Sequence, residues 1–396
     1  MIDHHIDTTP TGKDQMVTEQ QVREALRSVM DPEIGRPIED IGMLQAIEVE
    51  AGTVRVHVLI TIEGCPLKDR ITKDVTEAVR PLDGVSDVEV KLSPMSQEQR
   101  EALVQKLRGA TVAPAAGSPP PSKIRFPMST SIIAVASGKG GVGKSSVTVN
   151  VACALAAEGH RVGVLDADVW GFSVPRMMGV SGKPVGFNDM ILPLESHGVK
   201  VISMGFFVPE ETPVIWRGPM LHKAIEQFLG DVYWGDLDFL LCDLPPGTGD
   251  VSISLASFIP GASMLVVTTP QEAARKVAER AGKMAERTNL RPLGVIENMS
   301  YYVCPHCGER DEIFGSGGGA EAAETLGVPL MAQVPLMPAL RQGGDEGRPI
   351  VITDPDAPAS LALREAARAV ARATKSKVGK PLVLMTGPAA TAGHAH

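Results

Sequence analysis

From residue 131 onward, short apolar runs alternate with longer stretches of mixed polar and apolar residues. The runs are apolar along almost their whole length, rather than at every second position, and are rich in β-branched residues. Strands covered on both faces have this pattern, which is typical of a mostly parallel sheet flanked by helices. We therefore predict an α/β fold whose strands include 131–137 (SIIAVAS), 161–168 (RVGVLDAD), 238–245 (DFLLCDLP), 263–270 (SMLVVTTP) and 292–299 (PLGVIENM).

The first part of the chain has a different pattern of short amphipathic segments. Thr18 and Gln21 have the spacing of a capping box, and the apolar residues after them recur at helical spacing until Asp31 and Pro32. Alternating or β-branched segments predict strands, and a further amphipathic segment predicts a helix that begins near a proline. A compact α/β unit is expected within 18–93, with a helix over 65–79 and strands over 53–61 and 85–92.

Between these two parts the composition changes sharply. The segment GATVAPAAGSPPPSKIRFP, residues 109–127, is rich in Ala, Pro, Gly and Ser, which is typical of a linker. The last residues show no clear periodicity. The predicted organisation is a disordered N-terminus (1–17), a small α/β domain (18–108), a linker (109–128), a larger α/β domain (129–375) and a flexible tail (376–396).

Composition and charge narrow the class of protein. The chain has 396 residues, of which 43% are hydrophobic, and carries a formal net charge of −9. This acidity disfavours nonspecific binding to nucleic acid or to an anionic membrane. No apolar run has the length of a membrane span, and the polar N-terminal residues lack the pattern of a secretion signal. Five cysteines without a disulfide framework favour a reducing cytoplasm.

The segment ASGKGGVGKSSVTVN, residues 136–150, holds the pattern G-x-x-x-x-G-K-[ST] between a predicted buried strand and a predicted helix. Backbone N–H groups of such a glycine-rich turn surround phosphate oxygens, and the helix N-terminus attracts their charge. We expect Lys144 to reach the β- and γ-phosphates of a nucleotide and Ser145 to offer its hydroxyl to Mg²⁺. The predicted nucleotide ligands are Gly138, Lys139, Gly140, Gly141, Val142, Gly143, Lys144, Ser145 and Ser146.

Acidic residues end two of the predicted strands. Asp243 is followed by a Pro/Gly loop that leads to Asp250. We predict that Asp243 joins Ser145 in the Mg²⁺ shell, through water, and that the loop senses the γ-phosphate. Asp166 and Asp168 share one face of another strand end, where one of them would orient the attacking water. Paired aspartates at a strand end usually indicate a solvated loop, but the nearby phosphate-binding pattern favours a catalytic role.

A second lysine, Lys139, lies inside the pattern, too early in the loop to replace Lys144. The pattern GKGGVGKS resembles the deviant Walker A motif of an ATPase class that includes septum-positioning, chromosome-partitioning and nitrogenase iron proteins. In that class the early lysine reaches the partner's nucleotide across a dimer interface. The resemblance implies a homodimer with ATP between its protomers. Lys139 would then bring a second cation to the phosphates when the dimer closes, as an arginine finger does. A surface lysine that merely attracts phosphate is the plainer alternative.

Cys304 and Cys307 form the one close cysteine pair of the sequence. The spacing C-x-x-C places two sulfurs at a separation that can chelate a metal, whereas a tetrahedral sulfur site needs four sulfur ligands. A second protomer would supply the other two, and four thiolates suit a [4Fe–4S] cluster. Spacing alone leaves open a shared Zn²⁺, a site with His306 as a further ligand, and a redox disulfide. Cys153 and Cys242 fall on predicted core segments and are expected to be structural.

Several motifs in order resemble the Mrp-type (ApbC-type) iron–sulfur cluster carrier ATPases over residues 129–372: SGKGGVGKSS, LDADVWGFSVPRMMG, CDLPPGTGD and NMSYYVCPHCGERDEIFGSGGG. VMDPEIGRPIEDIGM and GCPLKDRI resemble the MIP18-like domain that is often fused in front of this ATPase. The resemblance implies a P-loop NTPase fold over 129–375 and an ATP-hydrolysing dimer. That dimer holds a labile cluster on Cys304 and Cys307 of both chains, takes it from scaffold or donor proteins, and hands it to apo-proteins.

The resemblance also bears on single residues. Asn298 matches a position associated in this class with adenine recognition, although an asparagine there also suits a local turn. Ser146 stands where the family commonly has threonine, and either hydroxyl can contact phosphate. Cys65 precedes Pro66 at an apparent helix start, where the helix dipole lowers the pKa of a thiol. It is a candidate accessory thiol for a cluster or persulfide, and a buried small residue is the alternative.

Two other functions fit parts of the sequence. A positioning or partitioning switch ATPase needs a membrane-binding helix or a basic face for DNA, and CPHC would then be a structural zinc clasp. The segment 376–396 makes a poor amphipathic helix, and the chain is acidic. An electron-transfer ATPase would hold its cluster tightly and use it for reduction. Metal content and cluster lability separate these functions from that of a carrier.

Overall fold

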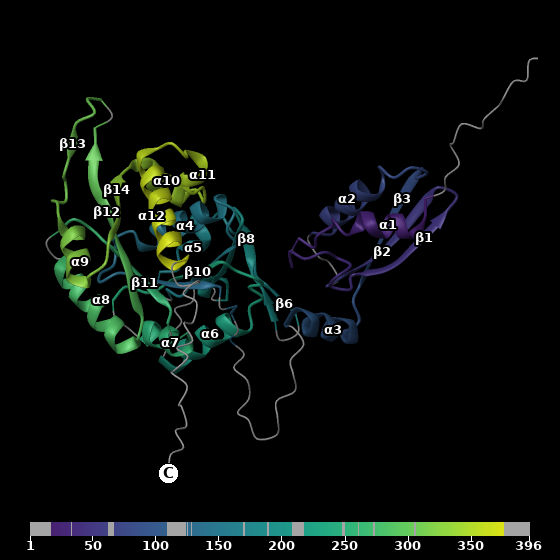
Figure 1. Cartoon of the computed structure of the whole chain (residues 1–396), viewed down its shortest axis with the longest axis horizontal. Helices are drawn as coiled ribbons and strands as arrows, with labels where there is room; N and C mark the ends of the chain where they lie inside the picture. Colours follow the sequence, from purple (N-terminus) through teal and green to yellow (C-terminus); the bar gives the residue numbers. More distant parts are fainter. Residues whose placement is uncertain are drawn as a thin grey trace, which may run out of the picture. The chain divides into compact units, whose positions relative to one another are not determined.

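The computed structural model describes residues 17–32, 34–61, 67–108, 124, 126–127, 129–168, 171–187, 190–207, 218–247, 250–259, 261–271, 274–304 and 306–375 (Figure 1). The chain divides into two compact units. One comprises Met1–Arg125, Gly182–Leu194 and Glu226–Gly235, and the other Phe126–Ser181, Glu195–Ile225 and Asp236–His396. The predicted N-terminal segment, linker and tail lie almost wholly outside the described residues, so their boundaries remain predictions.

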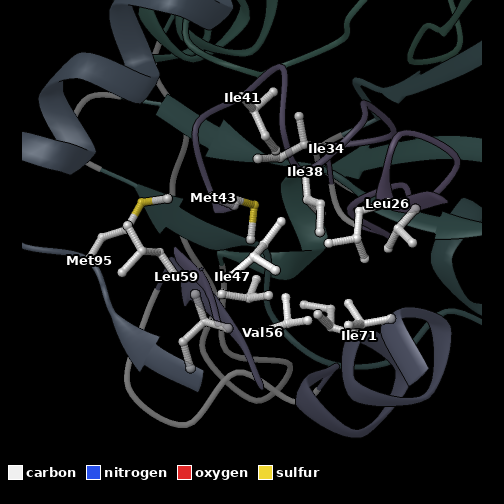
Figure 2. Close-up of a cluster of buried hydrophobic side chains, with 14 of the residues drawn as sticks. Leu26, Ile34, Ile38, Ile41, Met43, Ile47, Val56, Leu59, Ile71 and Met95 are labelled. Atoms are coloured by element: carbon white, nitrogen blue, oxygen red, sulfur yellow. The ribbon is translucent and has the colours of Figure 1, made fainter. Parts of the chain in front are cut away.

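The first unit holds a three-stranded sheet whose central strand is antiparallel to one neighbour and parallel to the other. Apolar side chains of the helices and the sheet form one core, which includes Leu26, Ile38, Met43 and Ile71 (Figure 2). Its elements in chain order are α1 (Glu19–Leu26), β1 (Leu44–Glu50), β2 (Thr53–Ile60), α2 (Lys68–Val79), β3 (Asp87–Pro94), α3 (Gln97–Arg108), β6 (Val185–Phe187) and β7 (Met190–Leu192).

Local signals predicted most of this unit. The capping box is confirmed: Thr18 Oγ1 accepts from the Gln21 N–H at 3.3 Å, and Gln21 Oε1 accepts from the Thr18 N–H at 2.9 Å. The predicted strands correspond to β2 and β3, and α2 lies within the helix predicted over 65–79. Residues 62–66, and with them Cys65, lie outside the described residues. The edge strand β1 had escaped prediction, because Ile47 is its one buried residue and its alternation is weak.

The second unit is built on a mostly parallel sheet, as predicted. Its strands β5, β10 and β11 are buried along their whole length, which explains their unbroken apolar sequences. The order in the sheet is β13-β12-β11-β4-β10-β5-β9-β8, with β14 paired to β12. The strands are β4 (Ser131–Ala136), β5 (Val162–Asp166), β8 (Leu194–Ser196), β9 (Val199–Ser203), β10 (Phe239–Asp243), β11 (Ser263–Thr268), β12 (Arg291–Val303), β13 (Arg310–Asp311) and β14 (Leu330–Leu336).

The order of the strands singles out the carboxyl end of β4 as the place where a ligand would bind. The chain leaves β4 toward β5 on one side and later adds β11 on the other, so β4 marks a switch point. Open α/β sheets bind ligands at the carboxyl ends of strands at such a point. The helices of this part are α4 (Lys144–Ala157), α5 (Val174–Met177), α6 (Gly218–Gly230), α7 (Asp250–Phe258), α8 (Ala274–Thr288), α9 (Gly318–Leu326), α10 (Pro338–Asp345), α11 (Ile350–Thr353) and α12 (Pro358–Lys375).

Candidate nucleotide site and cysteine hairpin

The predicted phosphate-binding turn joins β4 to α4. Ser137 Oγ donates to the Lys139 carbonyl oxygen at 3.0 Å and steadies the start of the turn. Gly141 (φ +79°) and Gly143 (φ +77°) have left-handed backbones, which glycine adopts without the penalty that a Cβ brings. A larger residue is also excluded by packing at position 143, because a Cβ there would lie 2.3 Å from the side-chain nitrogen of Asn298. Backbone conformation and packing therefore both require glycine at position 143.

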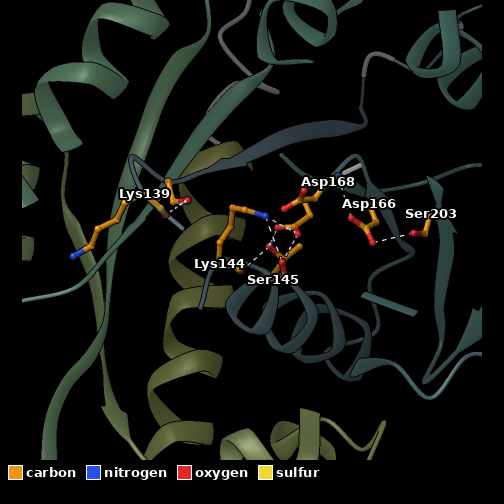
Figure 3. A network of polar contacts seen from close by, with 9 residues as sticks. Lys139, Lys144, Ser145, Asp166, Asp168 and Ser203 are labelled. Carbon is orange, nitrogen blue, oxygen red and sulfur yellow. Dashed lines mark hydrogen bonds and ion pairs between the residues drawn. The ribbon is translucent and has the colours of Figure 1, made fainter. Parts of the chain in front are cut away.

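Asp243, the last residue of β10, is the centre of a buried polar cluster. Its Oδ2 lies 2.7 Å from Lys144 Nζ and accepts from Ser145 Oγ at 2.5 Å, and its Oδ1 accepts from Thr148 Oγ1 at 2.8 Å. The carboxylate is fully buried and the lysine is 6% exposed, so the two charges compensate each other away from water. Figure 3 shows Lys144 and Ser145 converging on this point. The phosphate-loop lysine and both predicted Mg²⁺ ligands are thus brought together.

Asp166, the last residue of β5, lies beside this cluster. β5 and β10 pair in register, with Asp166 opposite Asp243. Asp166 accepts from Ser203 Oγ at 2.9 Å and from the Asp168 N–H at 3.2 Å (Figure 3). Burial and the charge of Asp243 raise the pKa of Asp166 to about 8, against the smaller opposing effect of these hydrogen bonds. The ionised form of the Asp166 carboxyl is therefore disfavoured at this strand end.

These side chains suit Mg²⁺ that arrives with a nucleotide. Asp166, Asp168 and Asp243 are all buried, and carboxyl oxygens are the ligands that a hard cation prefers. Within the part of the chain that the structure describes, no three His, Cys, Asp or Glu side chains are arranged to hold a metal ion. Mg²⁺ commonly takes one or two carboxylates and completes its shell with water and phosphate oxygens. Asp243 and Ser145 fit that requirement, with a nucleotide supplying the phosphates.

Lys139 points away from the ammonium group of Lys144 (Figure 3). Its Nζ donates to Oε1 of Gln271, which follows β11. The side chain therefore leaves the phosphate loop of its own chain.

Asn298, on β12, packs against the phosphate loop. Its Nδ2 donates to the Val142 carbonyl oxygen at 2.9 Å, and the side chain is 3% exposed. Its Oδ1 is also buried, and among the described residues it has no hydrogen-bond partner. A buried amide oxygen without a partner carries a desolvation cost, which a ligand that donates a hydrogen bond would remove.

Cys304 and Cys307 lie in the turn between β12 and β13, which pair as an antiparallel hairpin. The Cys304 N–H donates to the Glu309 carbonyl, and the Gly308 N–H to the Cys304 carbonyl, both at 2.9 Å. Figure 1 shows this hairpin projecting beyond the other strands of its sheet. Cys304 is partly exposed and Cys307 is exposed. The predicted pair is therefore presented to solvent at one tip, which we call the cysteine hairpin (Val303–Arg310).

The cysteines of the second unit differ in burial, and the pKa of Cys304 is shifted in the opposite direction from those of Cys153 and Cys242. Hydrogen bonds from the backbone N–H groups of Cys307 and His306 and from the Cys307 thiol lower the pKa of Cys304. The thiolate is the form that binds metal. Cys153 and Cys242 are buried, and burial raises the pKa of Cys153 to about 12 and that of Cys242 further. Their expected place in the core is confirmed.

Some polar residues of the site carry no motif of their own. Thr148 follows Lys144 by four residues, so both lie on one face of α4, and this spacing was a usable signal. Glu297 is a carboxylate inside an apolar run, which indicates a buried role. Ser203 ends β9 and Gln271 follows β11, and the order of the sheet alone brings them to Asp166 and Lys139.

A family model described as the NUBPL iron-transfer P-loop NTPase matches residues 129–371, more than half of the chain. The matched region includes the phosphate loop, the aspartates and the cysteine hairpin. The chain belongs to this family. A second model, described as an iron–sulfur cluster assembly protein, matches residues 19–92 of this family member. Both parts of the resemblance that the motifs had indicated are confirmed.

Proteins described as iron–sulfur cluster carriers are close in sequence to this family member. One from Mycobacterium leprae (strain TN) is 53% identical over 344 residues, 85% of this chain and 88% of that protein. One from Bacillus subtilis (strain 168) is 40% identical over 323 residues, 81% of this chain and 89% of that protein.

A solved structure supports the fold of this NTPase. A nucleotide-binding protein from Archaeoglobus fulgidus, in complex with ADP, is 39% identical and superposes with a TM-score of 0.50, over 56% of this chain and 88% of that one. The predicted P-loop NTPase fold is confirmed. Among the described residues, no helix is both long and apolar enough to cross a lipid bilayer.

Proposed function

We propose that this chain is an ATP-hydrolysing carrier that assembles a labile [4Fe–4S] cluster between two protomers and transfers it to apo-proteins. The observation that carries the proposal is one unit that combines the buried Lys144–Asp243 nucleotide site with an exposed pair of thiols, Cys304 and Cys307. Relatives described as iron–sulfur cluster carriers support it. Membership of a P-loop NTPase family supports nucleotide hydrolysis as the driving reaction.

In the proposed reaction MgATP binds to residues 138–146. Lys144 would exchange the carboxylate of Asp243 for the β- and γ-phosphates, and Asp243 and Ser145 would hold Mg²⁺. Asp166 or Asp168 orients the water that attacks the γ-phosphorus, and ADP and phosphate leave. The ion supplies a charge that offsets the phosphate oxygens.

Asn298 is the proposed adenine ligand. Its buried Oδ1 lacks a partner among the described residues, and the exocyclic amino group of adenine is a donor of the required kind. Its Nδ2 is already committed to the Val142 carbonyl, so the amide would link the base to the phosphate loop. Guanine presents a carbonyl oxygen in the same place and would leave Oδ1 unpaired.

Two observations support a homodimer. Lys139 is directed away from the phosphate loop of its own chain, and each chain offers two exposed or partly exposed thiols where a cluster needs four. In a two-fold dimer, Lys139 would reach the partner's nucleotide and the two cysteine hairpins would meet. Cluster scaffold or donor proteins would load this dimer in the cytoplasm, and apo iron–sulfur proteins would receive the cluster.

Nucleotide and cluster would be coupled through the loops 166–175 and 243–250. These loops follow β5 and β10, whose last residues are the buried aspartates; residues 169–170 and 248–249 lie outside the described residues. A response to the γ-phosphate would change the separation of the two hairpins and so bias cluster retention. Lys144→Ala, with folding intact, should then fail to transfer cluster, and transfer at the wild-type rate would refute the coupling.

The deciding experiment is anaerobic reconstitution with iron and sulfide, followed by Mössbauer spectroscopy and by analysis of iron, sulfide and zinc per dimer. One [4Fe–4S] cluster per dimer, absent from the double variant Cys304→Ser, Cys307→Ser, is the expected result. The matched control is Cys153→Ser, which should retain the cluster because that thiol is buried. Stoichiometric zinc without a cluster would refute the carrier function and indicate a switch ATPase with a structural clasp.

A further inference from the structure

One strand, β12, connects the nucleotide site with the cysteine hairpin. Midway along it, Asn298 Nδ2 donates to the Val142 carbonyl of the phosphate loop at 2.9 Å. The terminal methyl of the next residue, Met299, lies 3.8 Å from the position that a Cβ on Gly143 would take. The strand then ends one residue before Cys304. Asn298 of β12 thus contacts the loop that would hold phosphate, the side chain of Met299 lies beside that loop, and Cys304 follows the end of the strand.

The strand is kinked where it touches the loop. Met299 has φ +57°, a left-handed backbone that is unfavourable for a residue with a Cβ. Pairing with β14 also shifts here: Asn298 lies opposite Val334 and Tyr302 opposite Leu336, so four positions on β12 face two on β14. Extra residues of this kind form a β-bulge, which bends a strand and re-aims the residues beyond it. A strained backbone therefore separates the two halves of β12.

The half before the kink is anchored to the body of the unit by Glu297. This buried carboxylate accepts from the Gly319 N–H at 2.5 Å and from Gln333 Nε2 at 2.8 Å, which ties β12 to α9 and β14. It also accepts from Ser300 Oγ at 2.5 Å, across the kink itself. The donors from α9 and β14 hold this half of the strand in place, and the Ser300 bond spans the kink.

The half beyond the kink belongs to the cysteine hairpin. The guanidinium of Arg310 lies 3.8 Å from the centroid of the Tyr301 ring, and Val303 pairs with Arg310 in the ladder. The Cys304 N–H donates to the Glu309 carbonyl. These contacts join both strands of the hairpin, so a change of direction at Met299 would move the hairpin as one piece.

We propose that the kink at Met299 transmits the state of the phosphate loop to the cysteine hairpin, which makes Met299 a positioning residue for Cys304 and Cys307. A nucleotide that shifts Val142 and Gly143 acts on the side chains that touch them, and the strained backbone at position 299 converts that shift into a rotation of the hairpin. This inference rests on the proposed carrier function and adds β12 to the loops 166–175 and 243–250 as a route of coupling, but its test needs no cluster.

The test is the reactivity of Cys304 and Cys307 in reduced, cluster-free, full-length protein. Iodoacetamide labelling is followed by mass spectrometry, without nucleotide and with a saturating non-hydrolysable MgATP analogue whose affinity is measured for each variant. In the wild type the nucleotide should change the labelling rate at least about fivefold, the factor expected if one left-handed residue is strained in one state and relaxed in the other. Met299→Gly, which removes the strain, should reduce the change to less than about twofold.

Two variants make the result specific. Met299→Leu keeps a Cβ and a long apolar side chain, so it should retain the nucleotide response. His197→Gly relaxes another left-handed residue (φ +52°), in the exposed turn between β8 and β9, and should also behave as wild type. A loss of response in His197→Gly would show that the glycine effect is not local to β12 and would overturn the inference.

Other outcomes are equally decisive. An unchanged response in Met299→Gly, or no response in the wild type, overturns the proposed link. If Met299→Gly does not fold, amide hydrogen exchange of the wild type decides: the analogue must alter exchange over 301–311, and unaltered exchange there overturns the link. A hairpin that responds in a protein that takes up no cluster would refute the carrier function alone, whereas cluster uptake with an unresponsive hairpin would refute the link alone.

Discussion

Asp166→Asn should stabilise the nucleotide-free protein while it removes activity. The carboxyl is fully buried opposite Asp243, and its pKa is raised from 3.8 to about 8, first by burial and then by that neighbouring charge. An asparagine keeps the shape, can accept from the Asp168 N–H, and can donate to the Ser203 hydroxyl, whose proton is free to turn. The substitution therefore removes the charge with little change in packing.

The size and pH dependence of the effect derive from the raised pKa. The group favours folding when it is protonated, so its contribution is fully present below about pH 4 and is lost as the pH rises toward 8. Each unit between 3.8 and the working pH is worth about 1.4 kcal/mol, which gives upper values of about 2 kcal/mol at pH 5 and about 4 kcal/mol at pH 7. The advantage of Asp166→Asn over the wild type should grow across this range.

The assay is urea unfolding followed by circular dichroism, with EDTA and without nucleotide, from pH 5 to pH 8. Asp238→Asn is the matched control, because Asp238 is paired with Arg161 at 2.9 Å, which lowers its pKa. This pair contributes above pH 4, so its loss should cost less than about 1 kcal/mol at every pH tested. ATP hydrolysis by Asp166→Asn should fall at least about 100-fold. An Asp166→Asn protein no more stable than wild type at pH 8 would refute the electrostatic reasoning.

Three further predictions concern the phosphate loop and the thiols. Gly143→Ala should abolish ADP binding in calorimetric titrations, because its Cβ would meet Asn298 in a backbone with φ +77°; measurable binding would contradict the packing argument. Lys139→Ala should leave ADP affinity within about twofold but lower ATP hydrolysis at least about tenfold, and undiminished hydrolysis would remove the role across the dimer. The rate at which Cys304 is alkylated should rise with pH with a midpoint below 9.0, whereas Cys153 should be alkylated only in urea. Mass spectrometry of both residues across pH 6–10 measures these rates, and alkylation of Cys153 before Cys304 in the folded protein would contradict the prediction.

Features encoded within one short segment were predictable from the sequence. The capping box at Thr18 needs only its own helix, and the phosphate loop needs only β4, a glycine-rich turn and α4. Asp243 could be assigned because parallel strands end at one edge of the sheet, so an acidic strand end near the loop has few other places to lie. The pairing of Lys144 with Asp243 in the nucleotide-free chain is a consequence of that placement.

Contacts between distant segments were not predictable in the same way. Ser203 reaches Asp166 because β9 lies next to β5, and Gln271 reaches Lys139 because β11 lies next to β4; neither neighbour can be read from local composition. The edge strand β1 was missed because Ile47 is its one buried residue and a register shift between Leu44 and Ala46 interrupts its alternation. The kink at Met299 could not be predicted from the sequence either, because methionine is not a residue that indicates a left-handed backbone.

The pairing of Asp243 with Lys144 makes nucleotide binding an exchange of anions. Without a ligand, the carboxylate already neutralises the lysine, so an incoming phosphate must displace it and then lies beside a buried negative charge. A bare phosphate or metal-free ATP meets that repulsion in full, whereas Mg²⁺ gives the released carboxylate a new partner. If Asp243 holds Mg²⁺ as proposed, this site would discriminate against inorganic anions and favour a nucleotide that brings its own cation.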